Sequence, residues 1–193
     1  MRDLSGEQRL LSAAIDGDGR AFAQLVRPHL PMMYRLALRG CGQPALAEDA
    51  VQEALTVAHS KLGRYRAGTS MRAYLATIVI KRTHTLLRSE RRRRHREEIS
   101  LAPSLPATPL QHAEATALGR KIRAVLATMP KKRRAAVMLR LDGGMDYAEI
   151  SRALGTSEGS VRVLVHLALK ELKSGLKTYL GGGNDDEERR TKN

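Results

Sequence analysis

The sequence is poor in aromatic residues. Its 193 residues include no Trp, one Phe and five Tyr, so any core must be built from Leu, Ala, Val, Ile and Met. That choice of residues favours helices over strands. The hydrophobic fraction of 42% is too high for a wholly disordered chain. We therefore predict an all-α protein.

Metal-binding and membrane-spanning patterns are also missing. Cys41 is alone, so it makes no intramolecular disulfide and no Cys-rich zinc site, and the six His residues lack ligand spacing. We expect no metal and no other cofactor. No apolar run approaches the roughly 20 residues that a membrane-spanning helix needs, so we expect no membrane insertion. The acidic N-terminus lacks the apolar core of a signal peptide, which predicts a cytoplasmic protein.

Patterns typical of catalysis are absent as well. Glu48 and Asp49, like Glu97 and Glu98, are neighbours in the sequence and would point to different sides of a helix. The glycines at 181–183 precede an acidic, charged tail rather than a phosphate-binding helix. We therefore expect that the protein is not an enzyme.

Positive charge is what the chain has in excess. The formal net charge is +14, from 34 Lys and Arg against 20 Asp and Glu, which predicts a polyanionic partner, with nucleic acid as the leading candidate. Eleven of the Lys and Arg residues lie within residues 64–96, beside a single acid, Glu90. Arg can pair with phosphates, and Tyr65 and Tyr74 offer stacking planes, so this region predicts a nucleic-acid surface. For the run at 91–94 alone, a merely solvated face stays open.

The first half of the chain has a helical apolar periodicity. It predicts two short helices within residues 7–27 and a third that ends near Gly40 and Gly42. An amphipathic helix follows over residues 44–62, and Ser70 is expected to N-cap another over about residues 71–96. The apolar face of the helix at 44–62 is expected to consist of Leu46, Ala50, Val51, Leu55, Ala58 and Leu62.

A proline-containing segment without helical periodicity, with prolines at 103, 106 and 109, predicts a flexible linker. The chain is thereby divided into two small helical domains. The predicted parts are a first domain over 7–97, the linker over 98–112, a second domain over 113–180 and a disordered charged tail over 181–193.

The second domain is expected to begin with helices over about residues 113–128 and 131–142. In the latter, Val137, Met138 and Leu141 are expected to face inward. Four basic residues at 131–134 oppose the dipole of this helix at its start, so helix stability does not account for them.

Residues 145–162 have the pattern of a helix-turn-helix. Gly155 can take the left-handed conformation that ends the first helix, and Ile150 and Leu154 are expected to face its partner. The second helix would pack through Val161, Leu164, Val165, Ala168 and Leu172. Its opposite face carries Arg162, His166, Lys170 and Lys173, as a recognition helix that enters the major groove requires.

These motifs together resemble the extracytoplasmic-function (ECF) subgroup of bacterial sigma factors, whose two helical domains are called regions two and four. The resemblance covers roughly residues 10–178. Residues 47–54 are similar to the family's AED-x-x-Q-E helix, which binds the clamp coiled coil of the RNA polymerase β′ subunit. Residues 74–78 with Leu87 and Arg88 are similar to the helix that leads into recognition of the promoter minus-ten element. Residues 129–172 are similar to the domain that reads the minus-thirty-five element.

The resemblance implies a protein that binds core RNA polymerase, directs it to promoters and helps to open the DNA. The implied partners are core RNA polymerase, through its β′ clamp and β flap, promoter DNA, and an anti-sigma factor. The residues implied for core binding are Glu48, Asp49, Gln52 and Glu53. Those predicted to contact DNA are Arg64, Tyr65, Arg66, Tyr74, Lys81, Arg82, Arg88, Lys132, Arg133, Arg134, Ser160, Arg162, His166 and Lys170.

The chain also departs from the family pattern. Tyr74, Lys81 and Thr85 stand where the family commonly has Trp, Asn and Asp, and the expected recognition helix is rich in Leu rather than Arg. Val163 and Leu167 lie close to its polar face, where they could touch a thymine methyl group or another protein. Two further functions therefore stay open: a stand-alone helix-turn-helix regulator, and a degenerate sigma-like module that binds polymerase or a regulator without initiating transcription.

Overall fold

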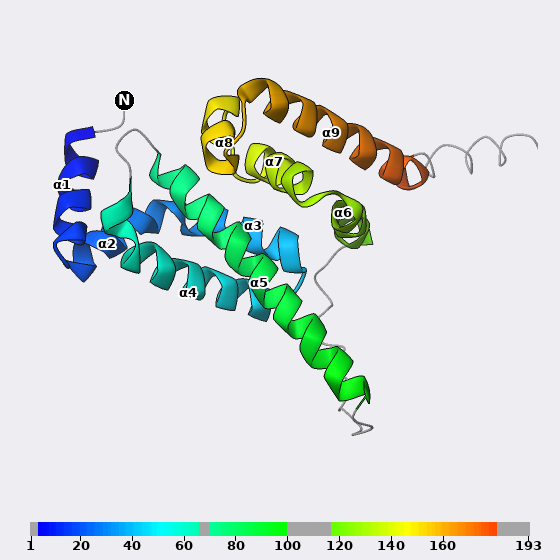
Figure 1. Ribbon diagram of the computed structural model, residues 1–193, viewed down its shortest axis with the longest axis horizontal. Coiled ribbons are helices and arrows are strands. Elements are labelled where there is room, and N and C mark those ends of the chain that lie inside the picture. The colour runs from blue at the N-terminus through cyan, green and yellow to red at the C-terminus, as the bar shows by residue number, and fades with distance from the viewer. Residues whose placement is uncertain (1–3, 66–69, 100–116, 181–193) are drawn as a thin grey trace, which may run out of the picture.

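The computed structural model describes residues 4–65, 70–99 and 117–180, and within these ranges it contains helices and no strand (Figure 1). The all-α prediction is confirmed. The elements in chain order are α1 (Leu4–Ile15), α2 (Gly19–Val26), η1 (Arg27–His29), α3 (Leu30–Cys41), α4 (Pro44–Ser60), η2 (Leu62–Arg64), α5 (Met71–Ile99), α6 (Ala117–Thr128), α7 (Lys131–Leu141), α8 (Tyr147–Leu154) and α9 (Glu158–Leu180).

Several helix ends lie where local chemistry predicts them. The carboxylate of Asp18 accepts hydrogen bonds from the backbone N–H groups of Arg20 and Ala21 at 2.8 and 3.1 Å, and so caps α2. Gly42 ends α3 in the left-handed conformation, with φ at 75°. The Ser70 hydroxyl accepts from the Ala73 N–H at 3.2 Å, as expected of the N-cap of α5.

α5 is the central helix of the first half, and α3 and α4 pack against it and against each other (Figure 1). The closest face of α4 is a stripe of four fully buried alanines: Ala47, Ala50, Ala54 and Ala58. Leu46, Val51 and Leu55 of the predicted apolar face are only partly buried. Small side chains occupy the crossing because they let two helix backbones approach closely.

The second half begins with α6 and α7 and continues into the predicted helix-turn-helix, α8 and α9. Asp146 and Glu149 form a reciprocal capping box at the start of α8, and Gly155 ends this helix with φ at 60°. Val161, Val165 and Ala168 are buried, as the pattern predicts. The prediction that Leu141 faces inward was wrong: its side chain is 59% exposed, because α7 ends at this residue.

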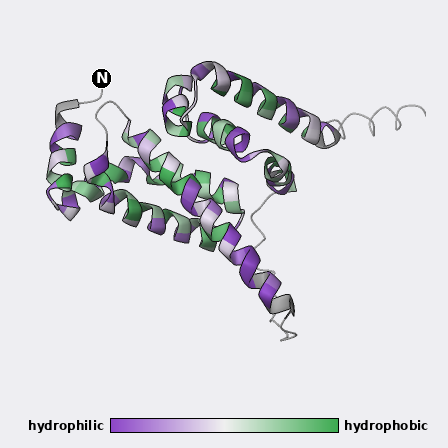
Figure 2. Ribbon diagram, in the orientation of Figure 1, coloured by the Kyte–Doolittle hydropathy of each residue, from purple (hydrophilic) through white to green (hydrophobic). Residues whose placement is uncertain are grey.

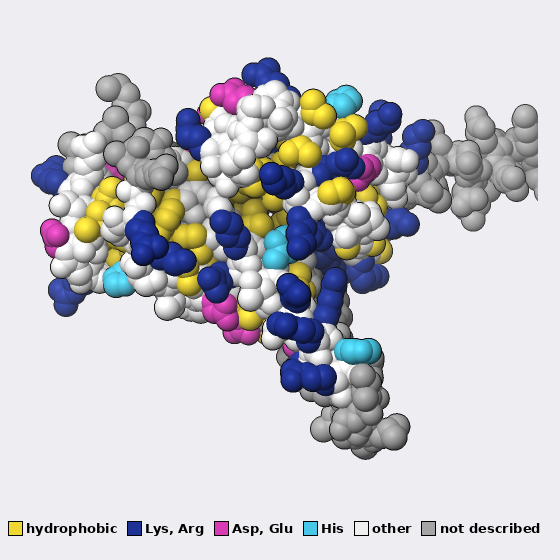
Figure 3. Space-filling view, in the orientation of Figure 1, with side chains coloured by type: hydrophobic (Ala, Val, Ile, Leu, Met, Phe, Trp, Pro, Cys, Tyr) yellow, Lys and Arg dark blue, Asp and Glu magenta, His cyan; other side chains and the backbone are white. Residues whose placement is uncertain are grey.

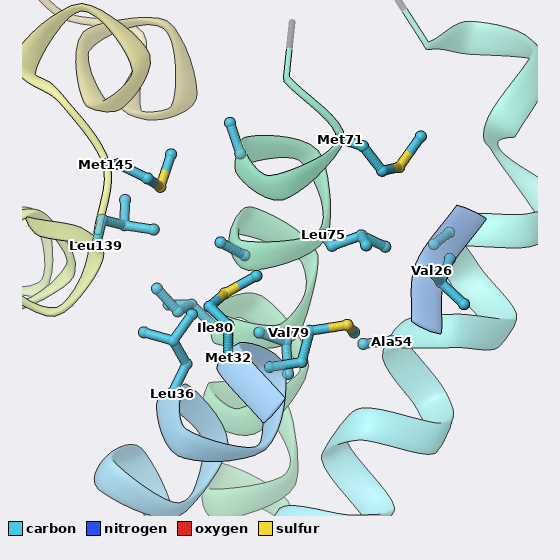
Figure 4. Packing of buried hydrophobic residues seen from close by; sticks show 14 of the residues in the cluster. Val26, Met32, Leu36, Ala54, Met71, Leu75, Val79, Ile80, Leu139 and Met145 are labelled. Carbon is cyan, nitrogen blue, oxygen red and sulfur yellow. The ribbon is translucent and has the colours of Figure 1, made fainter. Parts of the chain in front are cut away.

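The two halves pack directly on each other. Leu139 and Met145, from α7 and the loop after it, belong to the same buried cluster as Leu75 and Ile80 of α5 (Figure 4). Three polar contacts accompany this packing: Arg39 with Asp142, the Ser70 hydroxyl with Glu149 at 2.5 Å, and the Arg72 guanidinium with the Gly144 carbonyl at 3.1 Å. The sequence predicted a linker between the halves but no contact across it.

The end of the first half differs slightly from the prediction. α5 continues to Ile99, past the expected end near residue 96, and its C-terminal turns are strongly hydrophilic (Figure 2). The rest of the predicted linker and the predicted charged tail lie outside the described residues. Among the described residues, no helix is long and apolar enough to cross a membrane.

Candidate protein and nucleic-acid interfaces

The first candidate interface is the outer face of α4. The alanine stripe of α4 faces α3 and α5, so the positions between its members point to solvent. The residues there are Glu48, Asp49, Gln52 and Glu53, and all four are exposed. The structure therefore brings the four predicted core-binding residues together on one open acidic face, in a chain that is otherwise basic.

The predicted stacking tyrosines contact each other. The rings of Tyr65 and Tyr74 meet edge to face, with centroids 5.3 Å apart and planes at 81°. The Tyr74 hydroxyl donates to the Ala58 carbonyl at 3.0 Å and so links α5 to α4. Partial burial raises the pKa of both phenols. Of the two predicted arginines beside them, Arg64 is exposed in η2, and Arg66 lies outside the described residues.

The basic residues of α5 and α7 meet at a cleft of about 890 Å³ between the two helices. Lys81 and Arg88, both predicted to contact DNA, line this cleft from α5, and Arg134 lines it from α7. Figure 3 shows Lys and Arg side chains gathered where these helices approach each other. Arg82 is half-buried and lies outside the cleft lining.

The other basic residues at the start of α7 diverge. The Arg133 guanidinium forms an ion pair with Glu171 of α9 and so joins two helices of the second half. Lys132 is exposed and lines a smaller apolar pocket. The predicted cluster at 132–134 is therefore divided among three environments, because successive residues of a helix point about 100° apart.

The second candidate interface is the open face of α9. Arg162, His166 and Lys170 recur at four-residue steps and are exposed on one side of the helix, as predicted. Ser160 is exposed in the first turn, and its N–H donates to the Ser157 hydroxyl at 3.2 Å. The Arg162 guanidinium lies 5.2 Å from the ring centre of Tyr147, which connects it to α8.

The apolar residues of α9 that depart from the family pattern are partly exposed. Val163 is 58% exposed and Leu169 43%, whereas Leu167 is half-buried. The expectation that an apolar side chain lies beside the polar face is therefore confirmed for Val163. Such a side chain can contact a thymine methyl group or an apolar protein surface.

Sequence reasoning missed several residues that the tertiary structure brings together. Arg39 and Asp142, far apart in the chain, carried no local signal. His84, Arg91 and Lys131 line the basic cleft but were not among the predicted DNA contacts. The density of positive charge along α5 pointed only to Lys81 and Arg88 of the same lining. Their convergence depends on the packing of α7 beside α5, which no motif records.

Comparisons with known proteins agree with this geometry. Residues 25–93 match sigma-70 region 2, and residues 119–172 match sigma-70 region 4. The first match covers α3, α4 and most of α5, and the second covers most of α6, all of α7 and α8, and most of α9. The fold and these two matches thus define a protein of the sigma-70 class.

Curated relatives narrow the class. The ECF RNA polymerase sigma factor SigM of Mycobacterium tuberculosis is 30% identical over 156 residues, which are 81% of this chain and 77% of SigM. SigE of Mycolicibacterium smegmatis is 31% identical over 159 residues, which are 81% of this chain and 62% of SigE. The chain belongs to the ECF RNA polymerase sigma factors, which direct the polymerase to promoters.

Solved structures share the fold. CnrH, in complex with the cytosolic domain of CnrY, matches with a TM-score of 0.66 at 22% identity, over 90% of this chain and 98% of CnrH. The sigma factor RpoE of Bartonella quintana, in complex with the anti-sigma factor NepR, matches with a TM-score of 0.60 at 23% identity, over 81% and 96%.

Proposed function

We propose that this chain binds core RNA polymerase through the acidic face of α4 and reads a promoter with α5 and α9. The exposed set of Glu48, Asp49, Gln52 and Glu53 carries the proposal, because DNA repels an acidic surface and a protein partner accounts for it. The resemblance to the family supports the clamp coiled coil of the polymerase β′ subunit as the partner of this face. The second half would contact the β flap.

The DNA contacts are proposed on two elements. The region from Arg64 through α5, including Lys81 and Arg88, would hold the minus-ten element and the opened strand. The exposed face of α9, with Arg162, His166 and Lys170, would enter the major groove at the minus-thirty-five element. Linking two weak readers in one chain makes the second contact intramolecular, so neither half requires high affinity alone.

Binding both elements requires the halves to separate. By their positions the two elements lie about 25 base pairs apart, or roughly 85 Å at about 3.4 Å per base pair. In the packed structure α5 and α9 both contact the eight-residue α8, so they lie far closer together than that. Residues 100–116, fully extended, span at most about 60 Å, and the helices on either side supply the rest. We therefore infer a packed free chain that opens on the promoter.

An anti-sigma protein is a further proposed partner. Both structural neighbours above were solved in complex with a protein partner, and NepR is described as an anti-sigma factor. We infer that the chain acts in the cytoplasm, where such a partner and the polymerase would meet it. Family membership implies a regulatory rather than a catalytic role.

The core-binding assignment is tested with purified full-length chain and core RNA polymerase. Asp49→Ala and Gln52→Ala are each expected to weaken capture by core polymerase, because each removes a polar group from the acidic face. Asp16→Asn, altered at an exposed acid between α1 and α2, is the matched control and should bind normally. Unchanged core binding by both α4 variants would refute the clamp assignment.

Two outcomes would favour the other functions. Tight, specific promoter binding without any core binding would identify a stand-alone regulator. Tight core binding without run-off transcription above the level of core polymerase alone, on any promoter of a library, would identify an interaction module.

A further inference from the structure

The basic cleft between α5 and α7 collects positive charge from both halves of the chain. Ten of the described residues line it, and none of these is an Asp or Glu. The basic and titratable ones are Lys81, His84, Arg88, Arg91, Arg92 and His95 from α5, and Lys131 and Arg134 from α7. Lys131 and Arg134 join the α5 cations because α7 packs beside α5.

This convergence has an electrostatic cost. Arg134 is partly buried, and its Nε has no hydrogen-bond partner among the described residues. Burial lowers the pKa of its guanidinium, and the charge of Arg91 lowers it further. Burial also lowers the pKa of His84, with Arg134 and Lys131 adding to the effect. Like charges held together, with Arg134 and His84 partly buried among them, destabilise this packing unless an anion accompanies them.

The start of α7 adds hydrogen-bond donors at the same place. Its N-cap position is Pro130, no side chain of the described residues caps the helix, and its first turn contains no acid. The N–H groups of that turn consequently lack side-chain acceptors, and Lys131, which lines the cleft, stands at the first position. Uncapped N–H groups beside several cations suit a phosphate group.

An apolar pocket of about 180 Å³ adjoins the basic cleft. Both are lined by Lys81, His84 and Lys131, and the pocket adds Ile80, Ala135, Leu139, Ala153 and Leu154. A ligand with phosphates in the cleft could therefore place an attached apolar ring in the pocket.

We propose that this cleft binds a small anion carrying several phosphate groups, either an inorganic chain or the phosphates of a nucleoside. The cleft volume lies within the range of small-molecule sites, whereas a double helix meets proteins over a much larger surface. Because the anion contacts both α5 and α7, it stabilises the packed form of the chain. It also occupies Lys81 and Arg88, which the proposed function assigns to promoter DNA, so bound anion and promoter compete.

The test is isothermal titration calorimetry on the full chain at about 150 mM salt, with sodium tripolyphosphate and, separately, ATP without magnesium. Saturable binding of one tripolyphosphate per chain is expected. Arg134→Gln and Lys131→Gln should each weaken it at least about ten-fold, the loss of one charged hydrogen bond. Lys131 is exposed, so its variant serves if the Arg134 variant does not fold. If ATP binds more tightly than tripolyphosphate, the apolar pocket holds the nucleoside. If the two bind equally, the site recognises the phosphate chain alone.

The matched control is Arg93→Gln. Arg93 lies on the same helix, pairs with Glu90 at 2.9 Å and does not line the cleft, so its variant should bind normally. Non-saturable binding, or an equal loss in the Arg93 variant, would show general charge attraction and overturn the proposal. The proposal would also be overturned if a five-nucleotide oligothymidine bound more tightly than tripolyphosphate and lost this binding in the Arg134 and Lys131 variants. The cleft would then be a DNA groove. None of these outcomes depends on core polymerase, so the core-binding proposal is tested separately.

Discussion

Arg39 of α3 and Asp142 at the end of α7 form a two-pronged ion pair although they are 103 positions apart. The Arg39 Nε and one terminal nitrogen donate to the two carboxylate oxygens at 3.1 and 2.9 Å. The Asp142 side chain is 12% exposed and that of Arg39 38%, and the hydrogen bond raises the pKa of the guanidinium. This pair joins the first half of the chain to the second.

Breaking this pair should loosen the packed form. We expect Asp142→Asn to lower the free energy of unfolding by about 1 kcal/mol, because the ion pair is bidentate but partly solvated. Urea unfolding of the full chain measures the change. Arg35→Gln, at an exposed position of α3, is the control and should leave stability unchanged. A double-mutant cycle of Arg39→Gln with Asp142→Asn that showed no coupling would contradict the prediction.

A close helix crossing in the first half gives a packing prediction. A Cβ atom built on Gly40 would lie 2.9 Å from the Cγ2 methyl of Thr83, which is 3% exposed. The Thr83 hydroxyl donates to the Val79 carbonyl at 2.8 Å, and this bond fixes the methyl group in place.

We therefore expect Gly40→Ala to destabilise the chain by about 1 kcal/mol, because overpacking outweighs the gain in helix propensity. The melting temperature measures the effect. Gly159→Ala, in the first turn of α9 where a Cβ has no neighbour closer than 4.0 Å, should leave it unchanged or raise it. A more stable Gly40 variant would mean that α3 and α5 can move apart at no cost.

The proposed DNA contact of α9 can be measured through its salt dependence. Lys170→Ala should weaken promoter binding by the assembled holoenzyme and lower the slope of log affinity against log salt by about 1, the value of one phosphate contact. Lys177→Ala, at an exposed position two turns further along α9, is the control. An unchanged slope in the Lys170 variant would remove this residue from the DNA interface.

His84 should make stability depend on pH. The charges of Arg134 and Lys131 of α7 act on it, Lys81 and Arg88 line the same cleft from α5, and the described residues of the lining include no acid. Its pKa is lower in the folded chain than the ordinary 6.5, so the unfolded chain binds the proton more readily. The contribution of neutral His84 is complete above pH 6.5 and is lost as pH falls through the lower folded value.

The free energy of unfolding should therefore fall between about pH 7.5 and pH 5 by more in the natural chain than in His84→Gln, which cannot be protonated. Urea unfolding at both pH values measures it. His166→Gln, at an exposed position of α9, should keep the dependence of the natural chain. If the free energy of unfolding fell equally in the natural chain and in the His84 variant, His84 would be open to solvent in the cleft.

Much of the fold and part of the site could be predicted because they depend on local signals. Asp18, Gly42, Ser70 and Gly155 set helix ends through hydrogen bonds or backbone conformations within a few residues. The acidic face of α4 and the basic face of α9 follow from the helical period, which places residues three and four apart on one side. The prediction for Leu141 was wrong because helical periodicity does not indicate where a helix ends its contact with the helices it packs against.

The sequence by itself determined the helices, their caps, the division into regions 2 and 4, and the family. Only the tertiary structure decided that the halves pack together through Arg39 and Asp142, that Arg133 pairs with Glu171, and that Lys131 and Arg134 join the α5 cations around one cleft. The physical reason is the range of the interactions. Caps and helical faces depend on neighbours in the chain, whereas these contacts depend on which apolar surfaces of α5, α7 and α8 fit together. That fit is a property of the whole packed core.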